Sequence, residues 1–257
     1  MGSSITLTDL SRSPSNPCGS NWPEAHLRDI AGVARRHRVP VIADEVYAGL
    51  AWDVSFGKKP LRTEPRKQGK FNPGAFTSFA SICGEVPTLH LGGLSKRWLA
   101  PGWRTGWIIV HDPLSVLDDV REAMSRYAAR LQGPSSAVQV ALPKILADTP
   151  ESFFVETMDQ IKEAGDKLYE RVKTIPGLEP IRPAGAMYLM VGGLDNFPAF
   201  KSDNEFVRAL MEEQNFLILP GACFRLDNHL RFVTTMPWDK LSDACDRLEE
   251  FCAKYAV

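Results

Sequence analysis

Hydrophobic and polar residues follow two different patterns along the chain, and the pattern changes near residue 148. Before that point, helical periodicities lie between short, continuously apolar runs such as Val39-Pro40-Val41-Ile42-Ala43 and Trp107-Ile108-Ile109-Val110. Such runs, which lack polar alternation, are typical of strands buried on both faces of a parallel sheet. We therefore predict an α/β domain with a mainly parallel sheet over residues 1–147.

The helices of this first part are inferred from apolar residues at three- and four-residue spacing. One helix is expected over residues 23–38, because its proline suits the first helical position. Two more are expected over 116–131 and 135–147, the second bent at Pro143. Residues 53–74 carry lysines and arginines among glycines and prolines, which predicts a solvated loop.

From residue 148 onward, strands and helices are mixed. A long amphipathic helix is expected over 151–175, ended by Pro176-Gly177. Further strands are expected over 187–191, 216–219 and 230–233, and further helices over 204–214 and 239–255. This mixture predicts a second, smaller α+β domain over 148–257.

Composition narrows the classes of function. The 257 residues, 44% hydrophobic and 24% charged, are ordinary values for a soluble protein with a sizeable core. The formal net charge of -1 gives no electrostatic footprint for a polyanion, so no nucleic-acid partner is expected. No run is long enough to span a bilayer, and the first residues lack the apolar core of a signal peptide. We expect a cytoplasmic protein without a membrane partner.

The cysteines and histidines indicate neither disulfides nor a metal. The 5 cysteines contain no CxxC, which fits a reducing compartment, and Cys245 and Cys252 recur with apolar residues at helical spacing. Both are expected in the core. The 5 histidines show neither HExxH nor paired spacing, so we expect them at the surface or supporting a site, with no metal bound.

The candidate chemistry is concentrated in residues 92–104. Lys96 follows an apolar, strand-like run and the hydroxyl of Ser95, and Arg104 comes after a Pro-Gly turn. A lysine beside a hydroxyl and a guanidinium suits a cofactor that carries both an aldehyde and a phosphate. The amine condenses with the aldehyde, while Ser95 and Arg104 bind the phosphate. Pyridoxal 5'-phosphate is that cofactor.

Asp44 ends a predicted strand, at the edge where open α/β sheets place ligand-binding groups. A carboxylate there could pair with the pyridine nitrogen of the cofactor and keep it protonated. Tyr47 could hydrogen-bond the phenolic oxygen of the ring. The alternative is an aspartate that caps a helix and a tyrosine that fills the core, and each residue taken alone favours that alternative.

Arg231 lies inside an apolar predicted strand, where an unpaired charge would be costly. A buried arginine needs a carboxylate, and a bound amino acid brings one in the bidentate geometry that a guanidinium favours. The alternative is an internal salt bridge with an aspartate or glutamate of the same domain. The sequence leaves both interpretations open.

Five segments occur in the order seen in fold-type I aminotransferases, which depend on pyridoxal phosphate. They are Pro14-Ser15-Asn16-Pro17-Cys18-Gly19, Asp44-Glu45-Val46-Tyr47, Ser95-Lys96-Arg97-Trp98-Leu99 with Pro101-Gly102-Trp103-Arg104, Pro183-Ala184-Gly185-Ala186-Met187-Tyr188, and Leu230-Arg231. The lysine segment and the run Gly-Ala-Met-Tyr-Leu-Met most resemble tyrosine aminotransferases. The resemblance extends from about Ser13 to the C-terminus.

The resemblance implies the aspartate aminotransferase-like fold, with the C-terminal part of the large domain over 1–147 and the small domain over 148–257. It also implies roles: Lys96 as the Schiff-base lysine and proton carrier, Asp44 as the pyridinium partner, Tyr47 and Asn16 as donors to the ring oxygen, Ser95 and Arg104 as phosphate ligands, and Arg231 with Asn16 as the substrate carboxylate site. The implied reaction is amino transfer from tyrosine or a similar amino acid to 2-oxoglutarate, in a homodimer.

A whole enzyme of this family has further segments before its Asn-Pro-x-Gly motif. They carry a glycine-rich phosphate-binding turn, an aromatic residue on the pyridine ring and a tyrosine donated across the dimer interface. The residues before Ser13 offer no counterpart, so we expect a truncated isoform, a fragmentary gene prediction or an engineered piece. Absent strands would expose the edge and face of the sheet, and we expect weak cofactor binding by the chain alone.

Other functions stay open. C-S lyases and aminocyclopropane-carboxylate synthases resemble the same scaffold and differ from aminotransferases mainly in how they position the substrate. The chain could also be a catalytically silent partner of a full-length subunit. A hydrolase is disfavoured, because Gly93-Leu94-Ser95 lacks the second glycine of a nucleophile elbow.

Overall fold

The computed structural model describes residues 8–52 and 76–256, and these form two compact units. Among the described residues, unit 1 comprises 8–14, 21–52 and 76–155, and unit 2 comprises 15–20 and 156–256. The domain boundary predicted at 147/148 lies before this division. The loop predicted over 53–74 lies outside the described residues.

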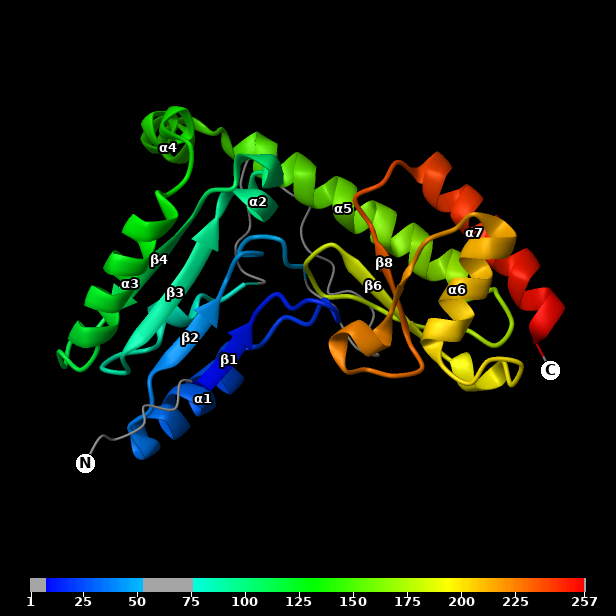
Figure 1. The fold of residues 1–257 in the computed structure, drawn as a ribbon, viewed down its shortest axis with the longest axis horizontal. Helices are drawn as coiled ribbons and strands as arrows, with labels where there is room; N and C mark the ends of the chain where they lie inside the picture. Colours follow the sequence, from blue (N-terminus) through cyan, green and yellow to red (C-terminus); the bar gives the residue numbers. More distant parts are fainter. Residues whose placement is uncertain (1–7, 53–75, 257) are drawn as a thin grey trace, which may run out of the picture. The chain divides into compact units, whose positions relative to one another are not determined.

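The described part of unit 1 contains a four-stranded sheet in the order β1-β2-β3-β4 (Figure 1). The strands are β1 (Thr8–Arg12), β2 (Val41–Asp44), β3 (Thr88–Gly93) and β4 (Gly106–His111). The pairs β1–β2 and β2–β3 are parallel, and β3–β4 is antiparallel. The mainly parallel sheet predicted from the apolar runs is therefore confirmed. β1, whose sequence is polar, was not predicted.

Helix α1 (Glu24–His37) covers one face of β2, and it forms where the sequence predicts it. Pro23 stands immediately before the helix in an extended conformation. The apolar stripe of the helix, two residues of β2 and three residues of the segment before β3 make one core: Leu27, Ile30, Ala31, Ala34, Val41, Ala43, Phe79, Cys83 and Val86. This core holds the carboxyl end of β2, where Asp44 lies.

The prediction that the strand at Trp107–Val110 is buried is wrong. Ile108 is 49% exposed and Ile109 is 57% exposed. Since consecutive strand residues point to opposite faces, both faces of β4 are open. β4 is also an edge strand of the described sheet. Its composition is that of an interior strand, but half of its residues, including Ile108 and Ile109, are exposed in this structure.

Three further α-helices of unit 1 lie within three residues of their predicted bounds: α3 (Asp118–Leu131), α4 (Ser136–Asp148) and α5 (Glu151–Val172), of which only the first residues belong to unit 1. The short helix α2 (Leu94–Arg97) was not predicted. α4 continues through Pro143, and neither α3 nor α4 contains a buried residue. α5 ends shortly before Pro176-Gly177, and the division between the two units falls inside it.

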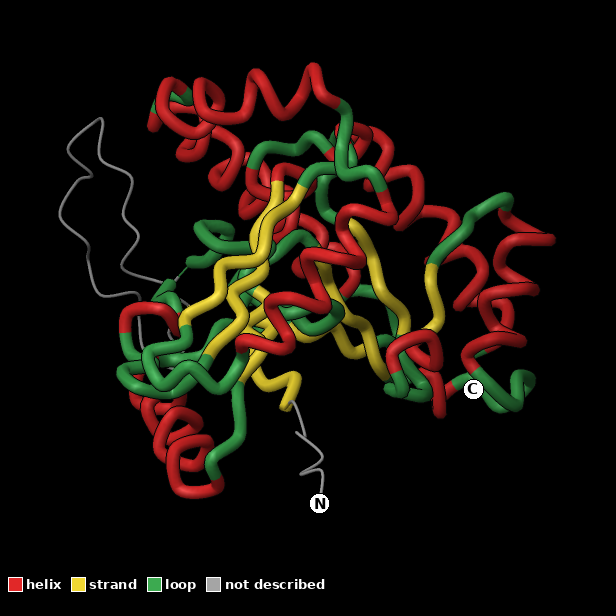
Figure 2. The backbone as a smooth tube through the Cα atoms, turned by 60° about the vertical axis from the view of Figure 1, so that its left-hand side comes forward, coloured by secondary structure: helices red, strands yellow, loops and turns green. Residues whose placement is uncertain are grey.

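Unit 2 contains an antiparallel sheet in the order β5-β6-β8-β7, with strands and helices distinguished by colour in Figure 2. Its elements are β5 (Glu179–Ile181), β6 (Tyr188–Gly192), α6 (Asp203–Gln214), β7 (Leu219–Pro220), β8 (Leu230–Val233) and α7 (Trp238–Tyr255). The strand predicted over 216–219 is wrong except at its last residue, and Leu217 is 68% exposed. β5 was not predicted. The α+β character is confirmed.

The core of unit 2 is formed mainly by aliphatic residues and phenylalanines of α5, α6, α7 and the sheet. Phe206 contacts both Phe197 and Phe251 edge-on, with ring centroids 5.3 and 5.2 Å apart. Cys245 and Cys252 are fully buried in this core, as predicted. Burial raises the pKa of these thiols to about 11 and about 12, so neither is a reactive nucleophile.

Candidate active site

Lys96 lies in α2, the four-residue helix that follows β3 directly. Two glycine contacts allow β3 and β4 to approach closely at this point. A Cβ on Gly106 would lie 2.9 Å from the Gly92 carbonyl oxygen, and one on Gly93 would lie 3.2 Å from the Thr105 carbonyl oxygen. The glycines therefore permit the close strand pairing from which the lysine helix emerges.

A helix of four residues cannot hold its shape alone, so its neighbours matter. The indole Nε1 of Trp98 donates to the Thr149 hydroxyl at 3.2 Å. The Arg97 guanidinium packs on the ring of Phe154, with its central carbon 4.5 Å from the ring centroid. Burial lowers the pKa of Arg97. These contacts anchor α2, and sequence reasoning missed them because the partners are distant in the chain.

A cavity of about 410 Å³ brings together three of the predicted site residues: Ser95, Lys96 and Arg104 all line it. The rest of the lining is Val46, Gly92, Gly93, Pro101, Thr105 and Gly106. The Nζ of Lys96 lies 5.4 Å from the centroid of the Tyr47 ring, which is 5% exposed. An amine, a hydroxyl and a guanidinium thus share one cavity beside a buried phenol.

Arg104 adopts a left-handed backbone conformation, with φ of 50°. Its Nη1 donates to the Pro101 carbonyl at 2.9 Å, and its side chain is exposed. A guanidinium has five N–H donors, so most of its donors are left for an anion in the cavity. A non-glycine residue in this conformation costs about 1–2 kcal/mol, which the turn after Pro101 must offset.

Asp44 ends β2, in register with Leu91 of β3. Its Oδ1 accepts a hydrogen bond from the Val46 backbone at 3.3 Å. Asp44 itself does not line the 410 Å³ cavity, whereas Val46 does. The structure therefore places Asp44 at the same sheet edge as the lysine. Its hydrogen bond to the backbone two residues on is also what a purely structural, capping role of Asp44 would predict.

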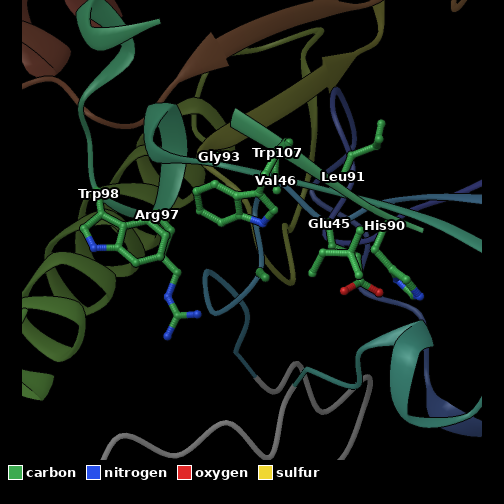
Figure 3. A pocket seen from close by; sticks show the side chains of 11 residues that line it. Glu45, Val46, His90, Leu91, Gly93, Arg97, Trp98 and Trp107 are labelled. Carbon is green, nitrogen blue, oxygen red and sulfur yellow. The ribbon is translucent and has the colours of Figure 1, made fainter. Parts of the chain in front are cut away.

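A second cavity, of about 130 Å³, shares Val46, Gly92 and Gly93 with the first (Figure 3). Glu45 lines it, and sequence reasoning missed this residue although it adjoins Asp44. The Glu45 carboxylate accepts hydrogen bonds from the Ser78 hydroxyl at 2.7 Å and the Phe79 backbone at 2.6 Å. Burial raises the pKa of Glu45, an effect that these hydrogen bonds oppose.

His90 also lines this second cavity, in Figure 3 on the same side as Glu45. It is 7% exposed, so of the two positions expected for the histidines, at the surface or supporting a site, it does not occupy the surface position. Neither ring nitrogen has a hydrogen-bond partner among the described residues. Burial lowers the pKa of His90, with a smaller contribution from His111. The ring is therefore held in its neutral form.

Arg231 lies in β8 of unit 2 and meets Asn16, 215 positions away in sequence. Its Nη1 donates to the Asn16 side-chain oxygen at 2.7 Å. The guanidinium carbon lies 4.3 Å from the Tyr188 ring centroid and 4.5 Å from that of Phe224. No carboxylate of a described residue pairs with Arg231, and its buried Nε has no acceptor there. The internal salt bridge that the sequence left open is absent from this part of the chain.

Asn16 lies in the loop of residues 15–20, which belongs to unit 2. The Gly19 carbonyl accepts a hydrogen bond from the Ala184 backbone at 2.9 Å. Gly19 has φ of +63°, and a Cβ there would lie 2.8 Å from the Gly185 carbonyl oxygen. This close approach requires a glycine, and it joins the Asn-Pro-x-Gly segment to the Pro-Ala-Gly segment.

The described residues contain no group of three or more histidines, cysteines, aspartates or glutamates that could hold a metal ion. All five cysteines are free thiols. Within the same residues, no helix is both long enough and apolar enough to cross a membrane.

Comparison with known proteins points to one family. The family model described as "Aminotransferase class I and II" matches residues 10–248. Tyrosine aminotransferase of Bos taurus is 40% identical over 252 residues, which are 97% of this chain and 52% of the bovine protein. The solved tyrosine aminotransferase of Leishmania infantum superimposes with a TM-score of 0.82 at 33% identity, covering 98% of this chain and 56% of that one.

A cystine lyase of Arabidopsis thaliana is 33% identical over 247 residues, which are 95% of this chain and 54% of the lyase. The chain spans about half the length of the curated relatives that it matches. The similarity to the Leishmania infantum structure extends over both units, so the fold of each unit is that of an aminotransferase.

Proposed function

Since this chain belongs to the class I and II aminotransferase family, we propose that it carries the pyridoxal-phosphate site of an aminotransferase, with Lys96 as the residue that bonds the cofactor. The observation that carries the proposal is the shared cavity of about 410 Å³, lined by Lys96, Ser95 and Arg104. An amine, a hydroxyl and a guanidinium are the donor set that an aldehyde and a phosphate on one molecule require.

When bound, the cofactor supplies an electron-withdrawing ring that stabilises the negative charge developing at the α-carbon of the amino acid. Ser95 and Arg104 hold its phosphate through charge-assisted hydrogen bonds. Asp44 would pair with the ring nitrogen and keep a proton on it, while Tyr47 and Asn16 would donate to the ring oxygen. The Nζ of Lys96 would bond the cofactor aldehyde in the resting site and, when free, would serve as the base that moves a proton at the α-carbon of the amino acid.

Arg231 receives the α-carboxylate of the substrate, with Asn16 beside it. This role is supported by the missing carboxylate partner of Arg231 among the described residues and by its buried Nε. We propose tyrosine or a similar amino acid as the donor and 2-oxoglutarate as the acceptor, because the relatives with 39–40% identity are named tyrosine aminotransferases. A homodimer and a cytoplasmic location complete the proposal, the latter in keeping with five free thiols.

The same proposal assigns residues 1–147 to the C-terminal part of a large cofactor-binding domain and 148–257 to a small domain. The contents of the two units support it: Lys96, Ser95, Arg104 and Asp44 belong to unit 1, and Arg231 belongs to unit 2. The cofactor site would then be contributed mainly by the first domain and the substrate carboxylate site by the second.

Borohydride reduction in the presence of pyridoxal phosphate tests the proposal. We expect a reduced phosphopyridoxyl label on Lys96, located by peptide mass spectrometry, and its loss in Lys96→Ala. Lys144→Ala is the matched control, because Lys144 is an exposed lysine of α4. A label distributed over surface lysines and unchanged in Lys96→Ala would contradict the proposal.

A second candidate within the same chemistry is C-S lysis, favoured by the 33% identity to a cystine lyase. Analysis of the products separates the two. A keto acid together with a new amino acid means amino transfer, whereas ammonia and pyruvate from a cysteine-derived substrate mean elimination.

A third candidate is a non-catalytic partner of a full-length subunit, favoured by the open faces of β4 and by the absence of buried residues in α3 and α4. Pull-down with a complete tyrosine aminotransferase, followed by the labelling experiment on the mixture, decides between catalysis by the chain and catalysis by its partner. Labelling of Lys96 in the isolated chain favours the main proposal.

A further inference from the structure

We propose that Tyr188 and Phe224, the ring pair, are positioning residues that hold the Arg231 guanidinium in place before a carboxylate arrives. The inference rests on the proposed role of Arg231 and adds the two residues that make that role possible. Neither belongs to the set of site residues that the sequence indicated.

The contacts come from two different elements around β8. Tyr188 begins β6 and pairs in register with Val233, so it is a diagonal neighbour of Arg231 on the adjacent strand. Phe224 ends the short 3-10 turn Gly221–Phe224. Their ring centroids lie 4.3 and 4.5 Å from the guanidinium carbon, within the range of a cation–π contact.

The protein uses only part of the N–H donors of the Arg231 guanidinium. Nη1 is taken by the Asn16 side-chain oxygen at 2.7 Å. Nε is buried and has no acceptor among the described residues, and Nη2 makes no hydrogen bond there either. Nε and Nη2 form one edge of the planar group, and a carboxylate bonds such an edge with two parallel hydrogen bonds. The ring pair contacts the guanidinium without using either donor of that edge.

Arg182 provides the contrast within the same unit. Its guanidinium carbon lies 4.0 Å from the Tyr169 ring centroid, so it too packs on an aromatic ring. Its Nη1, however, donates to Asp166 at 2.8 Å, and Nη2 donates to Glu170. A ring beside an arginine is therefore not enough to make a ligand site. Arg231 differs because its ring contacts replace carboxylates rather than accompany them.

The ring pair matters because an arginine side chain has many rotamers, and ordering them opposes binding. Two ring contacts restrict the guanidinium without using its donors, since a ring face attracts the cation and accepts none of its in-plane hydrogen bonds. A carboxylate then meets an arginine that is already ordered. Removing a ring should weaken carboxylate binding while the charge of Arg231 is unchanged.

Phe224→Leu tests the inference, because Phe224 is only partly buried and its replacement leaves the core intact. We expect about tenfold weaker binding of 2-oxoglutarate by calorimetry, which corresponds to about 1.4 kcal/mol. The Arg231 Nε–H resonance, shifted by the ring currents in the wild-type chain, should move towards its ordinary position. Circular dichroism confirms that the variant is folded.

Two further variants complete the test. Tyr169→Leu, which removes the ring under Arg182, should bind 2-oxoglutarate like the wild type. Tyr188→Phe keeps a ring beside Arg231 and should also keep the affinity, whereas deletion of this 5%-exposed ring would disturb the core. Wild-type affinity in Phe224→Leu, or loss of affinity in Tyr188→Phe, would overturn the inference.

Arg231→Lys separates this inference from the proposed function. If Arg231→Lys binds 2-oxoglutarate as tightly as the wild type, or the wild type does not bind it, the carboxylate role of Arg231 fails. The Nε–H resonance decides about the ring pair in either case. A resonance that does not move in Phe224→Leu shows that the ring does not hold the guanidinium.

Discussion

Individual residues explain why some of the site could be inferred from sequence and some could not. Lys96, Ser95 and Arg104 lie close together in the chain, so their motif already indicates that they lie near one another in the fold. Glu45 and Tyr188 contribute through contacts with residues far away in sequence, and Phe224 meets Arg231 only because the chain turns back into β8. Their types are common in cores, and no local spacing distinguishes them.

Glu45 makes a pH dependence testable at the scale of one residue. Burial raises its pKa above the ordinary 4.5, with a smaller contribution from the charge of Asp44. The folded state then binds a proton more readily than the unfolded state, so the free energy of unfolding should fall as the pH rises from about 4.5 through the raised pKa. Urea unfolding at a series of pH values measures this fall, and Glu45→Gln should flatten it.

Glu213 is the matched control for Glu45. Hydrogen bonds from Lys254 and Tyr255 lower its pKa. Its contribution to the free energy of unfolding therefore has the opposite sign. The Glu213 carboxylate stabilises the fold above its ordinary pKa of 4.5, and this contribution is lost as the pH falls through the lowered pKa. Glu213→Gln should leave the fall above pH 4.5 unchanged. An equal effect of both variants would show that the slope does not come from Glu45.

At the scale of elements, the bounds of several helices and strands could be predicted from sequence, but their burial and pairing could not. α1, α6, α7 and β8 lie within one or two residues of the ranges expected from periodicity. The strand over β4 was expected in the right place but wrongly as buried, because burial depends on neighbours that a local pattern does not contain. The strand predicted over 216–219 was too long for a related reason. An apolar run alone does not supply a pairing partner, and only Leu219 and Pro220 pair with β8.

The β3–β4 pair gives a prediction at this scale. Gly106→Ala should destabilise the chain by about 1–3 kcal/mol, since the added Cβ would lie 2.9 Å from the Gly92 carbonyl oxygen and the strands must separate. Gly102→Ala is the control, because a Cβ at Gly102 meets nothing within 4 Å. Denaturant unfolding measures both. Equal stability of the two variants would show that the close pairing beside Lys96 is not needed.

For the whole molecule, the notable feature is the amount of apolar side chain left at the surface of unit 1. Val140 is 83% exposed, Tyr127 64% and Ile109 57%. Large exposed apolar areas mark surfaces that bind something, or that associate when nothing covers them. The mainly parallel architecture could be predicted from sequence, whereas this exposure could not, because it depends on what covers each element.

Self-association is therefore expected for the isolated chain, and it should depend on unit 1. Ile109→Lys combined with Val140→Lys should reduce association in sedimentation velocity, while the free energy of unfolding changes by less than about 0.5 kcal/mol per site, as is usual for surface substitutions. Val33→Lys, at a 42%-exposed position of α1, is the control. If that control reduces association as much, the association surface is elsewhere.

The Asn16–Arg231 hydrogen bond joins positions 215 residues apart, and the loop that carries Asn16 is embedded in unit 2 while the chain on both sides of it belongs to unit 1. The backbone thus passes from one unit to the other more than once. No single scissile bond would divide this protein into two self-sufficient halves. Since Asn16 and Arg231 are 215 positions apart, their hydrogen bond closes a long loop, and its formation carries a correspondingly large loop-closure entropy.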